Sequence, residues 1–223
     1  MLYLVATPIG NLADITLRAL EVLRTCDYIL CEDTRHSLKL LRHYEIQKPL
    51  KSYHKFNEKR RCDEIIADLK AGVKVALITD AGTPLISDPG EILVQRCVEE
   101  QVPITTIPGP CAAIAALTLS GFSAVQFQLV SFLPKKSGGL TKALTALLAY
   151  EGTSICYESP YRLVKTLKAL CTLSPSRKVA VVRELTKIHE ECRRGTAQDL
   201  CNHYSKISVK GEIVLLISCE ENS

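Results

Sequence analysis

Residues 74–100 read KVALITDAGTPLISDPGEILVQRCVEE, and this stretch decides the fold. The apolar segment at 74–79 has the composition of a strand that is buried on both faces. A loop of small residues with two prolines follows at 80–90, and the apolar spacing at 91–100 is typical of a helix. A strand, a loop and a helix in this order form the repeating unit of a parallel α/β sheet.

The same order of elements is found on both sides of this stretch. Strands are predicted at 2–6, 28–31, 104–107 and, more weakly, 52–54, and helices at 14–25, 37–44 and 57–71. This repetition predicts a parallel, doubly wound sheet. Ligands of such sheets bind outside the carboxyl ends of the strands, so the loops at those ends are the candidate site.

After residue 121 the spacing of the elements changes. Strands are predicted at 127–132, 154–157, 178–183 and 212–218, and helices at 142–150, 161–171 and 198–204. We place a domain boundary near residues 111–120. Because no linker rich in glycine, serine or proline marks it, we expect the two halves to pack tightly.

Composition excludes several classes of protein. The chain has 223 residues, of which 47% are hydrophobic and 23% charged, as in ordinary globular proteins. No apolar stretch reaches the roughly 20 residues that a membrane-spanning helix needs, and the N-terminus MLYLVATPIGN lacks the marks of a signal peptide. We therefore expect a soluble, cytoplasmic protein that does not bind membranes.

Cysteine and charge distribution narrow the possibilities further. The ten cysteines form no CxxC pair, and neither they nor the five histidines have metal-ligand spacing, so we expect free thiols and no metal site. Residues 1–110 carry 14 Lys and Arg against 15 Asp and Glu, whereas residues 111–223 carry 14 against 9. This excess of positive charge permits a polyanionic partner on the second half. The few aromatic residues argue against base stacking as the main mode of RNA binding.

Two loops of the first half of the chain differ in the ligand that their residues indicate. The loop Thr7–Leu12 lacks both GxGxxG and GxxxxGK[ST], so neither NAD nor ATP is predicted, and a plain turn with left-handed angles at Gly10 and Asn11 is the alternative. The loop 80–90 combines the Asp80 carboxylate with small residues that let a ligand approach the backbone. It suits a nucleoside, the alternative being an elaborate turn.

Charged groups follow three further strands, at Glu32–Arg35, at Glu158 and at Arg183–Lys187. Each group alone is typical of a solvated surface or a helix cap. Their shared position at strand ends favours a site.

Taken together, these loops identify one family. The chain closely resembles the ribosomal RNA small subunit methyltransferase I family, of the tetrapyrrole methylase fold group, in collinear order over nearly its whole length. The segments that carry the resemblance are TPIGNLADIT (7–16), CEDTRH (31–36), ITDAGTPLISDPG (78–90), PGPCAAI (108–114), FLPKKS (132–137), YESPYRL (157–163), RELTKIHEE (183–191) and KGEIVLLI (210–217).

The resemblance implies a fold and an activity. It implies two α/β domains, 1–112 with a parallel doubly wound sheet and 113–223 with a mixed sheet, with a cofactor cleft between them. The implied activity is S-adenosylmethionine-dependent 2'-O-methylation of a cytidine in the decoding region of 16S ribosomal RNA. The substrate would be the RNA or the assembled 30S subunit, and a homodimer is expected.

The resemblance also assigns site residues. Those implied for the cofactor are Pro8, Asp80, Ala81, Gly82, Thr83, Cys111, Ala112, Tyr157, Leu185 and Ile213. Because a ribose hydroxyl is a poor nucleophile, a group must take or share its proton, and Glu184 and Lys187 are our candidates. Glu32, Asp33 and Arg35 would orient the acceptor or contact phosphate. Further phosphate contacts are expected from Lys55–Arg61, Lys135–Lys136 and Arg193–Arg194.

Some features leave alternatives open. The family often has His where this chain has Tyr161, an aromatic residue where it has His189, and a helical segment after the last strand. One alternative keeps the fold with a tetrapyrrole as methyl acceptor, although those relatives usually show GxGPGD where this chain has TPIGN. The other is a catalytically silent module that binds RNA or the cofactor.

Overall fold

A computed structural model describes residues 1–220 of the chain. The chain divides into two compact units, the first being Met1–Cys111 and the second beginning at Ala112. The division lies one residue before the predicted boundary. No helix of the described residues is both long enough and apolar enough to span a bilayer.

The first unit is a parallel sheet with the predicted double winding. Its elements are β1 (Leu2–Val5), the 3-10 helix η1 (Leu12–Asp14), α1 (Leu17–Thr25), β2 (Tyr28–Cys31), α2 (Thr34–His43), β3 (Leu50–Ser52), α3 (Glu58–Lys70), β4 (Val75–Leu77), α4 (Glu91–Glu99) and β5 (Ile104–Ile107). The strand order is β3-β2-β4-β1-β5, and every neighbouring pair is parallel. The predicted parallel sheet is thus confirmed.

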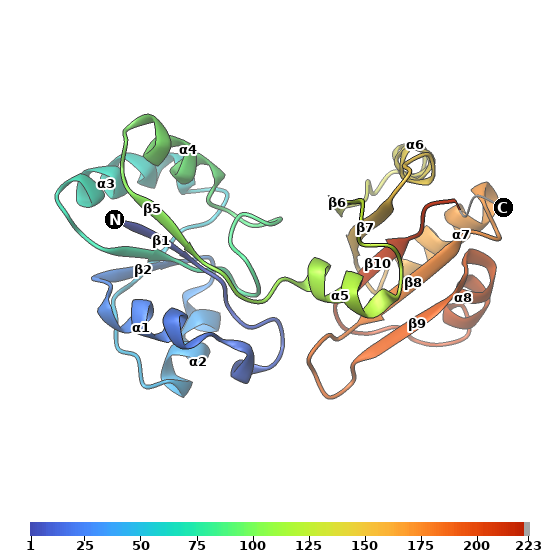
Figure 1. The fold of residues 1–223 in the computed structure, drawn as a ribbon, viewed down its shortest axis with the longest axis horizontal. Helices are drawn as coiled ribbons and strands as arrows, with labels where there is room; N and C mark the ends of the chain where they lie inside the picture. Colours follow the sequence, from blue (N-terminus) through green and yellow to red (C-terminus); the bar gives the residue numbers. More distant parts are fainter. Residues whose placement is uncertain (221–223) are drawn as a thin grey trace. The chain divides into compact units, whose positions relative to one another are not determined.

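Helices cover both faces of this sheet, with α1 and α2 on one side and α3 and α4 on the other (Figure 1). Successive residues of a strand pack on opposite faces of the sheet because side chains alternate along the strand. Ile29 of β2 packs in the core under α1 and α2, whereas its neighbour Leu30 packs under α3 and α4. Both residues are fully buried, which explains the continuous apolar run of β2.

The second unit contains a mixed sheet. Its elements are α5 (Ala112–Ser120), β6 (Phe127–Phe132), α6 (Ser137–Leu148), β7 (Thr153–Glu158), α7 (Leu163–Leu173), β8 (Lys178–Arg183), β9 (Glu191–Thr196), α8 (Ala197–Tyr204) and β10 (Ile213–Ile217). The order is β6-β7-β10-β8-β9, in which only β6 and β7 are parallel. The predicted mixed sheet is confirmed.

Helices α6, α7 and α8 pack on one face of this sheet, and α5 packs against β7, β8, β9 and β10 (Figure 1). Strand β10 runs antiparallel to both of its neighbours. Its first residue, Ile213, is therefore in register with Glu158 at the end of β7 and Arg183 at the end of β8. Topology thus brings the start of β10 to the strand ends that carry the charged loops.

Two elements of the second unit were not predicted. Helix α5 is apolar nearly all round, so it has no amphipathic period by which to recognise it. Strand β9 reads ECRRGT and shows no apolar alternation, because it is the edge of the sheet and is formed by pairing with β8.

Several predicted boundaries were also wrong. Helix α2 begins at Thr34 rather than at residue 37, because the Asp33 side chain caps it. Helix α6 begins at residue 137 rather than 142 despite two glycines, and β3 lies two residues earlier than predicted. The alternative interpretation of the loop after β1, a turn with left-handed angles at Gly10 and Asn11, is not found: neither residue has a positive φ, Asn11 has φ −113°, and its side chain caps η1.

Candidate functional site

Four loops at the carboxyl edge of the first sheet are joined by hydrogen bonds. Thr7 and Gly82 exchange two backbone hydrogen bonds, of 2.9 and 3.0 Å. The Thr83 hydroxyl donates to the Pro110 carbonyl at 2.9 Å. The Asp33 backbone N–H donates to Asp80 Oδ1 at 3.3 Å. The loops after β1, β2, β4 and β5 therefore meet, and they bring together the predicted cofactor residues Pro8, Asp80, Ala81, Gly82, Thr83 and Cys111.

Gly82 is required at its position by backbone conformation. Its φ is +88°, which residues with a side chain rarely adopt. A Cβ added there would lie 3.4 Å from Ile9 Cγ2 and 3.6 Å from the Pro110 carbonyl oxygen, which is ordinary contact. Glycine therefore suits this position because of its backbone conformation, and the loop has no side chain at residue 82.

Carboxylates gather at the same edge of the first sheet. Burial, together with the charges of Glu32 and Asp80, raises the pKa of Asp88 to about 6, against a hydrogen bond from Thr79 that lowers it. Like charges that raise a pKa mark a place where negative charge is not neutralised by the protein itself. Such an edge suits a ligand with a positive charge or several donor groups.

Asp33 and Arg35 interact mainly with each other. The Asp33 carboxylate accepts from the Arg35 backbone N–H at 2.9 Å and from its guanidinium at 2.8 Å. These hydrogen bonds lower the pKa of Asp33 to about 2. Asp33 is the N-cap of α2, so the helix-cap interpretation accounts for its conformation. Glu32 remains as an exposed carboxylate beside it.

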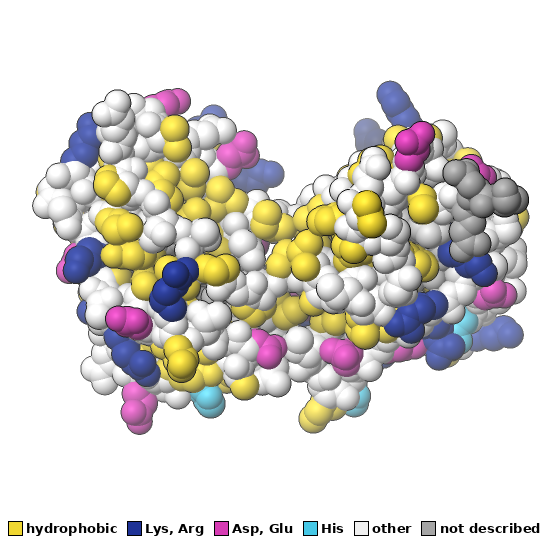
Figure 2. All heavy atoms as spheres, viewed as in Figure 1, with side chains coloured by type: hydrophobic (Ala, Val, Ile, Leu, Met, Phe, Trp, Pro, Cys, Tyr) yellow, Lys and Arg dark blue, Asp and Glu magenta, His cyan; other side chains and the backbone are white. Residues whose placement is uncertain are grey.

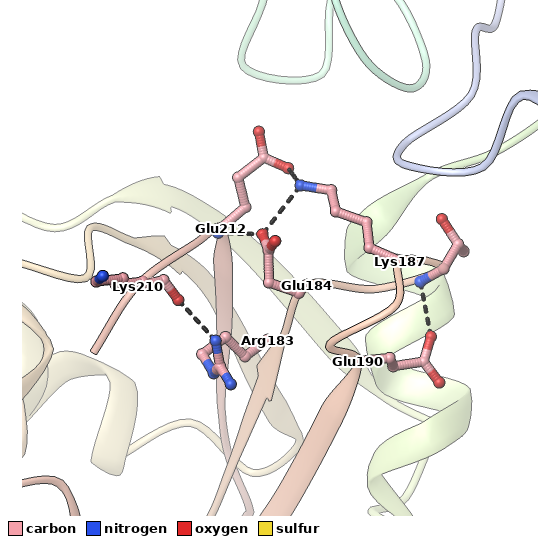
Figure 3. Close-up of polar contacts among 7 residues, drawn as sticks. Arg183, Glu184, Lys187, Glu190, Lys210 and Glu212 are labelled. Carbon is pink, nitrogen blue, oxygen red and sulfur yellow. Dashed lines mark hydrogen bonds and ion pairs between the residues drawn. The ribbon is translucent and has the colours of Figure 1, made fainter. Parts of the chain in front are cut away.

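In the second unit, the end of β8 carries a three-residue ion cluster (Figure 3). The Lys187 ammonium lies 2.9 Å from Glu184 Oε1 and 2.9 Å from Glu212 Oε2. Glu184 Oε1 also accepts the Glu212 backbone N–H at 2.8 Å, while the Glu184 backbone N–H donates to the Glu212 carbonyl at 3.0 Å. The structure therefore brings both of our candidate catalytic residues together.

These contacts fix the charge of both groups at neutral pH. The hydrogen bond from the Glu212 backbone lowers the pKa of Glu184, and the Lys187 ammonium lowers it further. Burial acts to lower the pKa of Lys187, but its two carboxylate partners outweigh burial, and the pKa is raised. Lys187 is therefore an ammonium ion, and Glu184 is an ionised, weakly basic carboxylate.

The loop after β8 has an unusual backbone. Glu184 has φ +53° and Thr186 has φ +63°, in the left-handed region that costs a residue with a side chain about 1 kcal/mol or more. The Thr186 N–H donates to Glu190 Oε2 at 2.6 Å, which holds the turn closed. Strained backbone of this kind is concentrated at functional sites.

The remaining cofactor residues are in the second unit. Ala112 begins α5, and Tyr157, near the end of β7, has its ring centroid 5.9 Å from that of Phe132. Leu185 and Ile213 are buried, and Ile213 belongs to the hydrophobic core. The side chain of Ile213 is therefore not accessible to a ligand.

A basic loop is anchored beside the same strand ends. Arg162 donates to the carbonyls of Leu133 and Pro134 at 2.9 Å each, and Lys165 donates to that of Lys135 at 3.2 Å. Three successive carbonyls are thereby held by α7 and the residue before it. The side chains of Lys135 and Lys136 are exposed.

The other basic groups expected to bind phosphate are placed differently. Arg193 pairs with Glu191 at 3.1 Å, and Arg194 donates to the Leu119 and Ser120 carbonyls at the end of α5. Arg194 therefore contributes to the fold, and its contact with phosphate stays a prediction. Residues 55–61 lie at and before the start of α3. On the face shown in Figure 2, Lys and Arg side chains are interspersed with acidic and uncharged ones.

Within residues 1–220, no group of three or more His, Cys, Asp or Glu side chains could hold a metal ion.

Sequence reasoning missed Gly211, Glu212 and Glu190. The only signal for the first two was their place in KGEIVLLI directly before a strand, while Glu190 lies in the polar run after Lys187.

Comparison with known proteins places the chain in a family. Residues 1–201 match the family Tetrapyrrole (Corrin/Porphyrin) Methylases. A ribosomal RNA small subunit methyltransferase I from a Synechocystis species is 48% identical over 219 residues, covering 98% of this chain and 78% of the relative. The chain belongs to the ribosomal RNA small subunit methyltransferase I family.

Two further members of this family have similar identity. The Mesorhizobium japonicum protein of the same name is 49% identical over 222 residues, covering 99% of this chain and 76% of the relative. The Thermotoga maritima protein is 42% identical over 220 residues, covering 99% of both chains.

Solved structures of the wider fold group agree on the architecture. A diphthine synthase structure superposes with a TM-score of 0.77 at 14% identity, covering 98% of this chain and 89% of the other. A uroporphyrin-III-C-methyltransferase from Thermus thermophilus gives 0.66 at 19% identity, covering 97% and 93%. At these identities the likeness shows the fold alone.

Proposed function

We propose that this protein methylates the 2'-hydroxyl of a cytidine in the decoding region of 16S ribosomal RNA, with S-adenosylmethionine as methyl donor. The observation that carries this proposal is identity of 42–49% to three ribosomal RNA small subunit methyltransferases I over 98–99% of the chain. The charged loops at the strand ends of both sheets support it. We place the reaction in the cytoplasm.

The residues of the first unit fit S-adenosylmethionine. When bound, this cofactor supplies a methyl carbon activated by a positively charged sulfur. The carboxylate edge of Glu32, Asp80 and Asp88 suits its positive charges and ribose hydroxyls, and the bare backbone at Gly82 lets the nucleoside approach. Pro8, Ala81, Thr83 and Cys111 complete this part of the proposed site. Ala112, Tyr157, Leu185 and Ile213 of the second unit stay predictions for the same ligand.

For the transfer itself, we assign an electrostatic role to the ion cluster. The 2'-hydroxyl gives up its proton to solvent, the oxygen donates an electron pair to the methyl carbon, and the bond from that carbon to the donor sulfur breaks; oxygen carries negative charge as the proton leaves. Lys187, a fixed ammonium, stabilises that charge, as preorganised donors do in other enzymes. Glu184 is a weak base because its pKa is lowered. Glu32, Asp33 and Arg35 would orient the acceptor or contact its phosphates.

The RNA partner is held in this proposal by phosphate contacts. The anchored, exposed Lys135 and Lys136 and the basic residues 55–61 are the proposed contacts. We further expect a homodimer, as the family resemblance implies. Sedimentation that shows only monomer at micromolar concentration would reject the dimer.

A methyl-transfer assay tests the function. Tritiated S-adenosylmethionine is incubated with the protein and either assembled small subunits that lack this modification or the corresponding naked RNA. We expect label in one cytidine of the RNA, mapped by the resistance of a 2'-O-methylated linkage to alkaline hydrolysis. Label in a tetrapyrrole acceptor, or in neither kind of substrate, would overturn the proposal.

A further inference from the structure

Gly211 lies directly under the side chain of Glu184. A Cβ built on Gly211 would meet Glu184 Cδ and Oε1 at a distance well below the 3.0 Å limit of real Cβ contacts. Gly211 also has φ +89°. The missing side chain therefore leaves the space that the Glu184 carboxylate fills.

The carboxylate in that space is the anchor of the ion cluster. The Glu184 carboxylate accepts hydrogen bonds from the Glu212 backbone N–H at 2.8 Å and from the Lys187 ammonium at 2.9 Å. The Glu212 carboxylate accepts a hydrogen bond from the same ammonium at 2.9 Å. Lys187 is further tied through its backbone N–H to the Glu184 carbonyl at 3.0 Å. Displacing the Glu184 side chain would break two hydrogen bonds and free one side of the ammonium.

The strain of this loop needs an explanation beyond local structure. Six described residues other than glycine have positive φ: Glu45, Leu85, Ser87, Gln101, Glu184 and Thr186. Glu45 and Gln101 directly follow the C-caps of α2 and α4, where left-handed residues end helices routinely. Glu184 and Thr186 end no helix. Their conformation instead places the carboxylate over Gly211 and the ammonium between two acids.

We propose that Gly211 and Glu212 are positioning residues that hold Lys187 as the fixed cation of the methyl-transfer site. Gly211 acts by leaving room for the Glu184 carboxylate, and Glu212 acts as the second partner of the ammonium. The proposal rests on the proposed function for its catalytic part. It assigns to the KGE segment at 210–212 a role that its place before a core strand does not reveal.

The substitution Gly211→Ala tests this, with Gly72→Ala as a matched control. Gly72 also has φ +89°, but a Cβ there would meet nothing within 4 Å. Both variants carry the same backbone strain, and only Gly211→Ala displaces Glu184. Glu212→Gln keeps Gly211 in place and decides the question if Gly211→Ala does not fold.

The first readout is independent of activity. Acetic anhydride acetylates neutral amines, so the labelling rate of Lys187 at pH 8 rises about tenfold for each unit by which its pKa falls. Mass spectrometry gives this rate relative to exposed Lys168 on α7 in the same molecule. We expect faster labelling of Lys187 in Gly211→Ala and Glu212→Gln, and the wild-type rate in Gly72→Ala.

The second readout is turnover. We expect kcat to fall about 10- to 100-fold in Gly211→Ala, as for a misplaced catalytic group, with unchanged cofactor Kd and a wild-type kcat in Gly72→Ala. Wild-type labelling of Lys187 in both folded variants would overturn the positioning role, and faster labelling with an unchanged kcat would overturn the catalytic part of the proposal. Absence of methyl transfer by the wild type would overturn the proposed function and the catalytic part of this proposal, and unchanged labelling would overturn the positioning alone.

Discussion

Charged residues lie both at the carboxyl edge of the first sheet and at the end of β8 in the second unit, but only the second group is paired with opposite charge. At the first, burial and the charges of Glu32 and Asp80 raise the pKa of Asp88 to about 6. At the second, Lys187 is held between two carboxylates. An unneutralised edge favours a cationic ligand, whereas a paired cluster holds a fixed cation for a developing negative charge.

The two loops share one property, which is backbone strain. Leu85 and Ser87 in the loop after β4 have φ of +71° and +70°, and Glu184 and Thr186 in the loop after β8 have +53° and +63°. In both loops, the two strained residues are separated by one residue. Strained backbone is thus found in both loops, and the loops differ in whether their charged side chains are paired.

Removing the fixed cation should have the largest effect. We expect Lys187→Ala to lower kcat by about 10²- to 10³-fold, because a preorganised group that stabilises developing charge is lost. RNA affinity should stay near the wild-type value, and Lys168→Ala on α7 is the control. Steady-state methyl transfer and filter binding give the two quantities. If Lys187→Ala and Glu184→Gln both keep the wild-type rate, catalysis must depend on Glu32, Asp33 and Arg35 instead.

Blocking the loop after β4 should come next. Gly82→Val should weaken cofactor binding by at least about 100-fold, or about 2.8 kcal/mol, because the side chain takes up space that the ligand needs. Gly72→Val is the control, since it bears the same positive φ in open space. Calorimetry measures the affinity, and circular dichroism checks the fold. Equal affinity in the two variants would remove this loop from the site.

The anchored basic loop should show a smaller, salt-dependent effect. Replacing Lys135 and Lys136 together with Ala should reduce the slope of log affinity against log salt by about 1.4, as expected for two lost contacts to single-stranded phosphate. Cofactor affinity should not change. RNA binding measured at several potassium chloride concentrations tests this, and an unchanged slope would place the phosphate contacts elsewhere.

The helix-cap interpretation of Asp33 predicts a modest loss of stability. Asp33→Ala should lower the free energy of unfolding by about 1 kcal/mol, since α2 loses its N-cap. Asp33→Asn should cost much less, because asparagine caps helices as well as aspartate but cannot pair with Arg35. Denaturant unfolding measures both variants. An equal loss in the two would show that the ion pair, and not the cap, stabilises this turn.

The smallest effect is expected on thermal stability, at the carboxylate edge formed by Glu32, Asp80 and Asp88. The pKa of Asp88 is raised in the folded protein, so the folded state holds its proton more tightly and loses stability as the pH rises from about 4 to 6. Asp88→Asn, which removes the charge, should therefore raise Tm at pH 8 by about 1–2 °C. This gain should shrink as the pH falls through the same range. A gain that is constant with pH would contradict the raised pKa of Asp88.

Much of the fold could be predicted because its signals are local. The apolar run at 28–31 gave the strand bounds found in the structure, since a strand buried on both faces needs continuous apolar residues. Helix α5 and strand β9 were missed for the opposite reason. Neither has a period of its own, and each exists because neighbouring strands offer it a surface or a pairing edge.

The candidate site divides in the same way. The types of residue at the strand ends, such as Asp80, Glu184 and Lys187, are properties of the sequence, as is the resemblance that names the family. Only the tertiary structure decided that Lys187 lies between Glu184 and Glu212, because the antiparallel register of β10 with β8 joins residues that are 25 positions apart. The same contacts decided which groups are charged, since a pKa depends on neighbours that local sequence does not specify.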